Sequence, residues 1–135
     1  MKRSRERGVA AVEFALLLPV LALILFGIIE FGLLLYDQQV ITNASREGAR
    51  AGIVEAATRP ILADITTVVT SYTGNYLVTF AGGTVNPSVT APSGTCTAFG
   101  SSLEVSVTYQ YTFLVLKNFG FKGPLMTANT TMRCE

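Results

Sequence analysis

The sequence predicts an α+β fold in which one long N-terminal helix packs on a small antiparallel β-sheet. Two observations support this class. Apolar residues crowd into the stretch from Val9 to Tyr36, which is long enough for a helix that crosses a membrane. Two segments near the C-terminus instead alternate between apolar and polar residues, as half-buried strands do. The 135 residues of the chain fit one modest domain beside such a helix.

A basic leader, residues 1–8, precedes the apolar stretch and looks like a peptide meant to be removed. Without it the chain keeps 6 basic and 8 acidic residues, a net charge of −2. Nucleic acid is therefore not an expected partner. Basic residues beside a first apolar helix favour a cytoplasmic N-terminus, so we expect the body of the protein to lie on the other side of the membrane.

The membrane span is assigned to residues 9–36. Its most continuous part, Phe14 to Tyr36, has 23 residues, which form a helix about 34 Å long and match a hydrocarbon core of about 30 Å. Pro19 removes one backbone hydrogen bond and is expected to kink the helix. The sequence therefore predicts a single span in contact with membrane lipid.

Two carboxylates, Glu13 and Glu30, interrupt the apolar stretch. A carboxylate at membrane depth is costly to bury, which indicates a use at that depth. Glu30 can stay protonated, reach outward, or pair with a basic group on another protein. The two residues are 17 positions apart, about 100° around a helix, and do not share a face. Paired acid–base chemistry between them is excluded.

The helix is expected to continue beyond the membrane over residues 37–59. It should stop near Arg59, because Pro60 disfavours a helical residue before it. Small residues recur at every fourth position of this extension, at Ala44, Gly48, Gly52 and Ala56. Such a ridge lets another backbone approach closely. It serves either packing within the subunit or a contact between subunits.

Residues 60–135 are predicted to form a small α+β domain outside the cytoplasm. The β-branched segment from Ile61 to Ser71 is compatible with a second helix or with a strand. Asn75 to Phe80 is a candidate short strand. Ala81 to Gly100 is rich in Gly, Pro, Ser and Thr and is predicted to be an irregular loop.

The clearest strand signal runs from Leu103 to Val115, where apolar residues occupy every second position. A turn-forming connection follows at residues 117–124, and alternation resumes from Met126 to Cys134. Two alternating segments joined by a short connection are typical of an antiparallel hairpin. We therefore predict that these two strands pair.

Cys96 and Cys134 are the two cysteines of the chain. If the body is exported, a disulfide between them is expected, and two free thiols are the alternative. Closing the loop of 38 residues between them would stabilise the fold by roughly 4 kcal/mol in the chain-entropy model.

Catalysis finds little support in the sequence. The chain has no histidine, so the usual nucleophile–histidine triads and most zinc sites lack their central residue. It also has no phosphate-binding glycine loop and no dinucleotide fingerprint. We therefore expect a protein that is not an enzyme and that has no cofactor and no metal site.

The residues around the leader resemble the processing site of type IV pilin-like proteins, in which Arg7-Gly8 is followed by apolar residues and by Glu13-Phe14. Residues 7–52 resemble, more specifically, the TadE-like pseudopilins of the tight-adherence, or Flp, pilus system. The supporting residues are Glu13-Phe14-Ala15, Leu18-Pro19, Phe26-Gly27, Glu30-Phe31-Gly32, Tyr36 and Asn43-Ala44-Ser45-Arg46-Glu47-Gly48-Ala49-Arg50. After residue 52 the resemblance is diffuse.

The resemblance implies a type IV pilin-like fold and a minor pilin rather than the principal fibre subunit, since the principal pilins look much shorter. It implies cleavage between Gly8 and Val9 by a prepilin peptidase, which needs a glycine in order to approach the backbone. Glu13 would then be the fifth mature residue. Glu13 and Phe14 would form an assembly site at which the new α-amino group of Val9 pairs with the carboxylate.

The resemblance also implies the surroundings of the protein. It places the chain in a bacterial inner membrane, where its partners are other pilin subunits and minor pilins and the assembly platform of an adhesive pilus. The alternative is an uncleaved single-span anchor that carries an extracytoplasmic interaction domain, which leaves Gly8, Glu13 and Glu30 without a reason. A secretory signal peptide fits less well, because the apolar run is too long and no small-residue cleavage site ends it.

Overall fold

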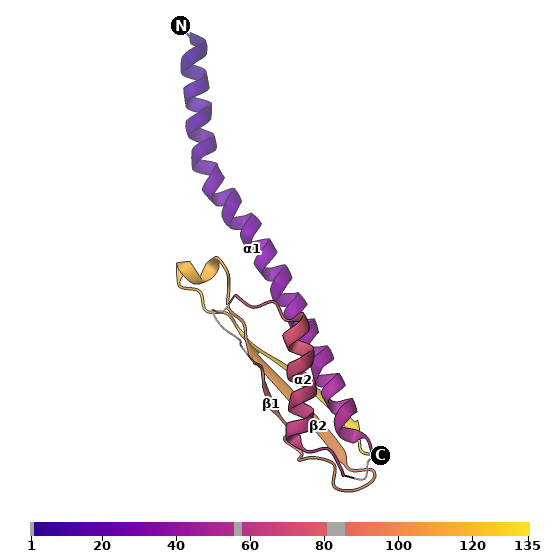
Figure 1. Cartoon of the computed structure of the whole chain (residues 1–135). Helices are drawn as coiled ribbons and strands as arrows, with labels where there is room; N and C mark the ends of the chain where they lie inside the picture. Colours follow the sequence, from indigo (N-terminus) through magenta and orange to yellow (C-terminus); the bar gives the residue numbers. More distant parts are fainter. Residues whose placement is uncertain (1, 56–57, 81–85) are drawn as a thin grey trace.

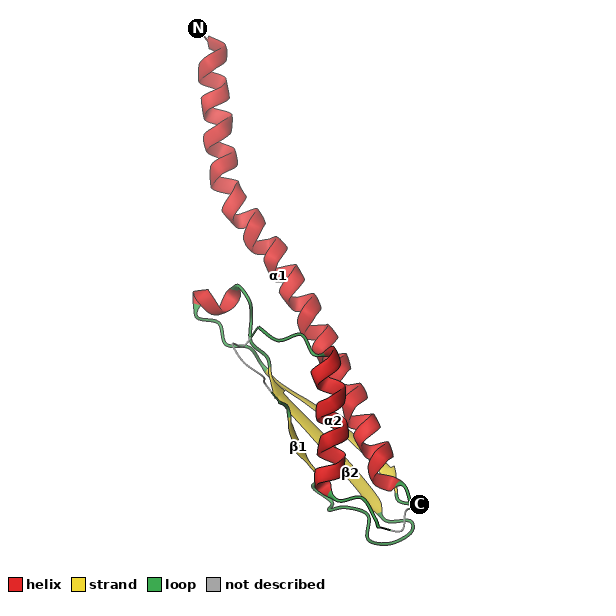
Figure 2. Ribbon diagram, viewed as in Figure 1, coloured by secondary structure: helices red, strands yellow, loops and turns green. Residues whose placement is uncertain are grey.

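The computed structural model describes the backbone of residues 2–55, 58–80 and 86–135, with side chains from residue 8 onward within these ranges. The elements are α1 (Lys2–Ile53), α2 (Leu62–Tyr76), β1 (Ser88–Thr90), β2 (Ser102–Gln110), the short 3₁₀ helix η1 (Leu116–Phe119) and β3 (Leu125–Arg133). Both α-helices pack on a three-stranded sheet, while the N-terminal half of α1 projects beyond this body (Figure 1). The predicted α+β class is confirmed, with both α-helices preceding the three strands along the chain (Figure 2).

α1 is one uninterrupted helix of 52 residues that includes Pro19. Its ribbon bends gradually along the N-terminal half (Figure 1), so the kink predicted near Pro19 takes the form of a curve, as a single missing hydrogen bond allows. In the described part of the chain, this is the one helix that is long and apolar enough to cross a membrane. It indicates a single-pass membrane anchor.

The C-terminal end of α1 lies at Ile53, earlier than the predicted stop near Arg59. The carbonyl oxygen of Ile53 accepts a hydrogen bond of 3.2 Å from the backbone N–H of Glu135. The end of the chain thus satisfies one of the carbonyl groups that the last helical turn leaves free. Part of the predicted extension, residues 56 and 57, lies outside the described residues.

The ridge of small residues on α1 packs within the subunit, so the first of its two interpretations is confirmed. A Cβ atom at Gly48 would lie 2.6 Å from Cγ2 of Val69 on α2, and one at Gly52 would lie 2.6 Å from Cδ2 of Leu103 on β2. Ala44 is fully buried in the same core. Glycines at these positions therefore let α2 and the sheet approach the helix axis closely. The remaining member of the ridge, Ala56, lies outside the described residues.

The segment that could be helix or strand forms α2. The side chain of Asp64 accepts a hydrogen bond of 2.9 Å from the backbone N–H of Ile61 and so caps the first turn. Ile65, Val69 and Thr73 recur every four residues and are buried, which gives the β-branched run a packed face. The strand predicted from Asn75 to Phe80 is wrong, because α2 continues to Tyr76 and residues 77–80 belong to no strand.

The sheet has the order β1-β2-β3, and both pairings are antiparallel. Gln110 pairs with Leu125 at one end of the β2–β3 hairpin and Ser102 with Arg133 at the other, which confirms the predicted hairpin. β2 ends at Gln110 rather than Val115. β1 was not predicted and lies within the segment predicted to be a loop, of which residues 81–85 fall outside the described residues.

The core lies between the helices and the inner face of the sheet. Cys96 and Cys134 form the predicted disulfide, with their Cα atoms 5.8 Å apart. This bond holds the segment before β2 to the end of β3. The buried apolar residues of this core include Ile41, Ala44, Ala49, Ile65, Val69, Leu103, Val105, Val107, Tyr109, Tyr111, Met126 and Ala128.

Candidate functional site

The residues predicted for processing and assembly lie on consecutive turns of α1, and all of them are exposed. Val9 and Glu13 are four residues apart and share a face of the helix. A Cβ atom at Gly8 would meet no atom within 4 Å. Packing in the described part of the chain therefore gives no reason for a glycine at this position, although a glycine inside a helix costs about 1 kcal/mol relative to alanine.

The apolar surface of α1 continues uncovered from Val9 to Ile29. Phe14, for example, exposes 62% of its surface. Exposed apolar side chains surround the helix on all sides: Val12, Leu16, Leu17, Leu18, Val20, Leu21, Leu23, Ile24, Leu25, Phe26 and Ile28. Such a surface is far larger than soluble monomers expose and suits lipid or neighbouring apolar helices.

At Glu30 the environment of α1 changes. The side chain of Glu30 is 1% exposed, and its carboxylate accepts hydrogen bonds from the backbone N–H groups of Val115 and Leu116 at the start of η1. The hydroxyl of Tyr111 also donates a hydrogen bond of 3.4 Å to the carbonyl oxygen of Glu30. The partners of the Glu30 carboxylate are thus backbone N–H groups of the same chain. None of the three alternatives predicted from the sequence included such partners.

Asp37 lies two helical turns after Glu30 on the same face and is fully buried. Its Oδ1 accepts a hydrogen bond of 2.9 Å from the backbone N–H of Val78, whereas Oδ2 has no hydrogen-bond partner among the described residues. Burial raises the pKa of Asp37 to about 6, and the bond from Val78 opposes this rise. Asp37 thus fixes the segment after α2 to α1, which also explains why that segment forms no strand.

Tyr111 lies near both of these carboxylates. It is 1% exposed, and its pKa is raised to about 12 by burial first and then by the negative charges of Asp37 and Glu30. Its ring packs edge-on against Phe113, with ring centroids 5.5 Å apart. We call Glu30, Asp37 and Tyr111 the junction cluster, because they lie where the bare half of α1 meets the body.

Sequence reasoning identified Glu30 but neither its hydrogen-bond partners nor the role of Asp37. The available signal was their separation of seven residues, which places two carboxylates on one helix face. The structure does not bring Glu13 to this cluster. Within the described residues, no group of three or more His, Cys, Asp or Glu side chains could hold a metal ion.

The run from Asn43 to Arg50 divides between two faces of α1. Its small members Ala44, Ser45, Gly48 and Ala49 are buried, and Ser45 shares a hydrogen bond of 2.7 Å with the hydroxyl of Thr130 on β3. On the outer face, Arg50 and Glu47 form an exposed ion pair of 3.5 Å. The run therefore serves helix-on-sheet packing on one side and a solvated surface on the other.

Comparison with known proteins identifies the N-terminal segment. Residues 8–50 match the family model described as TadE-like protein. This match includes the junction of leader and span, the bare half of α1, Glu30, Asp37 and the run that ends at Arg50. Comparisons with curated proteins and with solved structures give no significant match.

Proposed function

We propose, from the match of residues 8–50 to the TadE-like family model, that this chain is a minor pilin that acts in the assembly or initiation of a Tad pilus. The observation that carries this proposal is the bare apolar half of α1, which begins with Gly8 and Glu13 and is joined to a disulfide-bonded body. The resemblance described above implies that principal pilins are much shorter and lack such a body. The role is structural rather than catalytic.

The first step of this function is removal of the basic leader by a prepilin peptidase after Gly8. An exposed glycine that no packing contact requires suits an enzyme that must reach the backbone. The leader lies on the cytoplasmic side of the inner membrane and the body on the opposite side. Cleavage exchanges a basic segment for one α-amino group on Val9.

The second step is pairing of that amino group with Glu13, within one subunit or between neighbours. The carboxylate of Glu13 makes no ion pair with the described side chains, so it is available to a partner. A buried charge without a partner is destabilising by several kcal/mol. Pairing in the membrane therefore favours one axial register of this subunit against other pilins at the assembly platform.

Two variants test these steps in cells that contain the peptidase and the remaining pilus components. Gly8→Val should block cleavage, which is measured as a shift of the chain to higher mass on immunoblots of membranes. Glu13→Val should leave cleavage largely intact and reduce pili on the cell surface. Leu17→Val, one turn further along the same bare helix, is the matched control and should retain both cleavage and pili.

The outcomes separate this function from the alternative of an uncleaved anchor. If the wild-type chain and the Gly8→Val chain both retain the leader and therefore run at the same mass, the uncleaved anchor is supported. Equal numbers of pili in wild type and Glu13→Val would contradict the proposed pairing step. They would not contradict the proposed cleavage after Gly8.

A further inference from the structure

The loop between β2 and β3, residues 111–124, lies at the level where the bare half of α1 ends. Glu30 holds the backbone N–H groups of Val115 and Leu116, which fixes the loop to α1 at that height. The bare segment from Val9 to Ile29 is about 31 Å long as a helix, close to the thickness of a hydrocarbon core. In Figure 1 the loop with η1 is the part of the body that reaches furthest toward the N-terminal half of α1.

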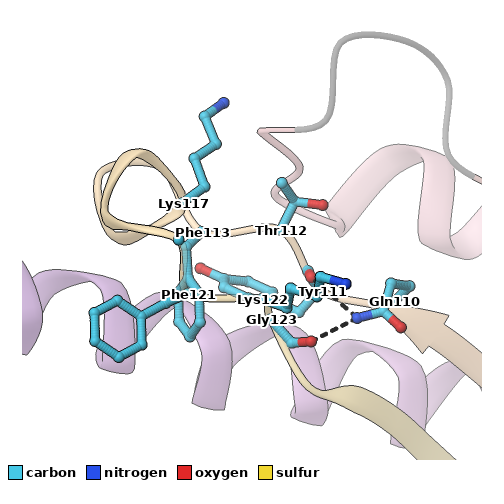
Figure 3. A pocket seen from close by; sticks show the side chains of 9 residues that line it. Gln110, Tyr111, Thr112, Phe113, Lys117, Phe121, Lys122 and Gly123 are labelled. Atoms are coloured by element: carbon cyan, nitrogen blue, oxygen red, sulfur yellow. Dashed lines mark hydrogen bonds between the residues drawn. The ribbon is translucent and has the colours of Figure 1, made fainter.

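The loop has a defined shape. Gly120 ends η1 with φ = 85° and its backbone N–H bonds to the carbonyl oxygen of Lys117 at 3.1 Å, a reversal that a residue with a side chain rarely adopts. At the base, Gln110 donates a hydrogen bond of 2.6 Å to the carbonyl oxygen of Gly123 (Figure 3). A Cβ atom at Gly123 would collide with the carbonyl group of Tyr111. The loop therefore turns tightly after η1, and its two strands are held together at the base.

The tip of this loop exposes apolar side chains beside basic ones. Phe119 and Phe121 expose 63% and 60% of their surfaces, and Leu114 is also exposed, as is Leu125 at the start of β3. Lys117 and Lys122 are exposed between them, and they are the two lysines of the chain outside residues 1–8. The loop contains no acidic residue. Figure 3 shows the ring of Phe121 and the side chain of Lys117 extending away from the loop backbone.

We infer that residues 114–122 are a second membrane contact, which rests on the lipid surface next to α1 and takes anionic headgroups. Aromatic rings prefer the boundary between headgroups and acyl chains, and the positive charge of lysines there attracts anionic headgroups. A body tethered by one helix can rotate and tilt. A loop that touches the bilayer beside that helix fixes the tilt of the body, with Glu30 connecting the two contacts.

This inference depends on α1 crossing a membrane, but not on cleavage after Gly8 or on pilus assembly. It would stand if the protein were an uncleaved anchor. Failure of the loop to meet lipid would likewise leave the proposed pilin function intact.

The chain has no tryptophan, so a single introduced tryptophan reports its own surroundings. The test uses the full chain as the Phe121→Trp variant in vesicles of phosphatidylcholine, with and without phosphatidylglycerol, that contain brominated lipids. Phe99→Trp is the matched control, because Phe99 is 84% exposed in the loop whose Gly100 bonds to Cys134. That loop lies near Ile53, about 35 Å further along α1 than Glu30.

We expect brominated lipid to quench Phe121→Trp several times more strongly than Phe99→Trp, and the emission of Phe121→Trp to be shifted to shorter wavelength. Quenching should increase with phosphatidylglycerol, and Lys117→Gln with Lys122→Gln should abolish that increase. Brominated lipids occupy both leaflets, so the orientation of the protein in the vesicle does not affect the result. Phe119→Trp repeats the measurement at a second exposed position.

Equal, weak quenching of Phe121→Trp and Phe99→Trp by lipid, with equal quenching of both by aqueous acrylamide, would overturn the inference. Protection of Phe121→Trp that arises only at high protein-to-lipid ratio, without quenching by lipid, would also overturn it and assign the loop to a neighbouring copy of the chain.

Discussion

The two halves of α1 are parts of one continuous helix, yet they are built for different surroundings. From Val9 to Ile29 the helix is apolar on every side except at Glu13, and none of its residues is buried. From Glu30 to Ile53 one face is covered by α2 and the sheet, and it carries small residues and buried polar groups such as Ser45. The opposite face is polar, as with Arg46 and Arg50.

This difference shows that contact with the body determines which residues of α1 can lie in the membrane. Assigned by hydropathy, the span reaches Tyr36, but Glu30, Leu34 and Asp37 already belong to the contact with the body. The bare part alone, about 31 Å, is sufficient to cross a hydrocarbon core. Glu30 is therefore better described as the boundary between the halves than as a charge inside the membrane.

The largest expected effect comes from adding volume to the covered half. Gly48→Leu places a side chain where a Cβ atom alone would lie 2.6 Å from Val69. Overpacking of this kind is expected to destabilise the body by about 3 kcal/mol. Thermal unfolding of the full chain in detergent, followed by circular dichroism, measures the loss.

The control for this comparison is Gly27→Leu in the bare half, where a Cβ atom meets nothing within 4 Å. It should leave the unfolding transition of the body unchanged. Equal destabilisation by the two variants would contradict the division of α1 into a covered and a bare half.

The next effect concerns the boundary. Glu30→Ala removes the acceptor for the backbone N–H groups of Val115 and Leu116, and leaving such groups without a partner costs on the order of 2 kcal/mol. Amide hydrogen exchange at these two residues should then be at least about tenfold faster. Glu13→Ala in the bare half should not alter exchange there. Unchanged exchange in Glu30→Ala would show that the loop is held without this carboxylate.

An effect that depends on pH is expected at Asp37. Its pKa rises from its ordinary value of 3.8 to about 6 in the folded chain, so the folded state binds the proton more tightly than the unfolded state. The resulting stability is present in full below about pH 4 and is lost as the pH rises through about 6. Asp37→Asn resembles the protonated form and keeps an acceptor for Val78.

Asp37→Asn should therefore stabilise the body by on the order of 2 kcal/mol above pH 6 and change it little below about pH 4. Unfolding measured across this pH range tests the claim. A stabilisation that is the same at both ends of the range would show that the charge of Asp37 is not the cause.

Much of this fold is predictable from local pattern, and the exceptions have physical reasons. The alternation in β2 and β3 and the capacity of Cys96 and Cys134 to pair are visible in the sequence. β1 is three residues long, too short to show a period among Gly, Pro and Ser. The strand predicted from Asn75 is absent because α2 continues to Tyr76 and because the backbone N–H of Val78 bonds to Asp37, 41 residues earlier.

The junction cluster could be predicted only in part. Local sequence shows that Glu30 is costly to leave in lipid, but its partners at Val115 and Leu116 are 85 and 86 residues away. Their interaction depends on where the hairpin returns to α1, which no local pattern contains. The predicted processing and assembly site is instead visible in local sequence, at Gly8, Val9, Glu13 and Phe14. The structure of one chain does not test it, because its function requires partners outside this chain.

The intact mass of the protein extracted from membranes of cells with an active prepilin peptidase tests the account most directly. The account predicts a mature chain that begins at Val9, with the bare half of α1 freed from its basic leader and Glu13 as the fifth residue. A chain that retains Met1 to Gly8 in such cells would contradict it.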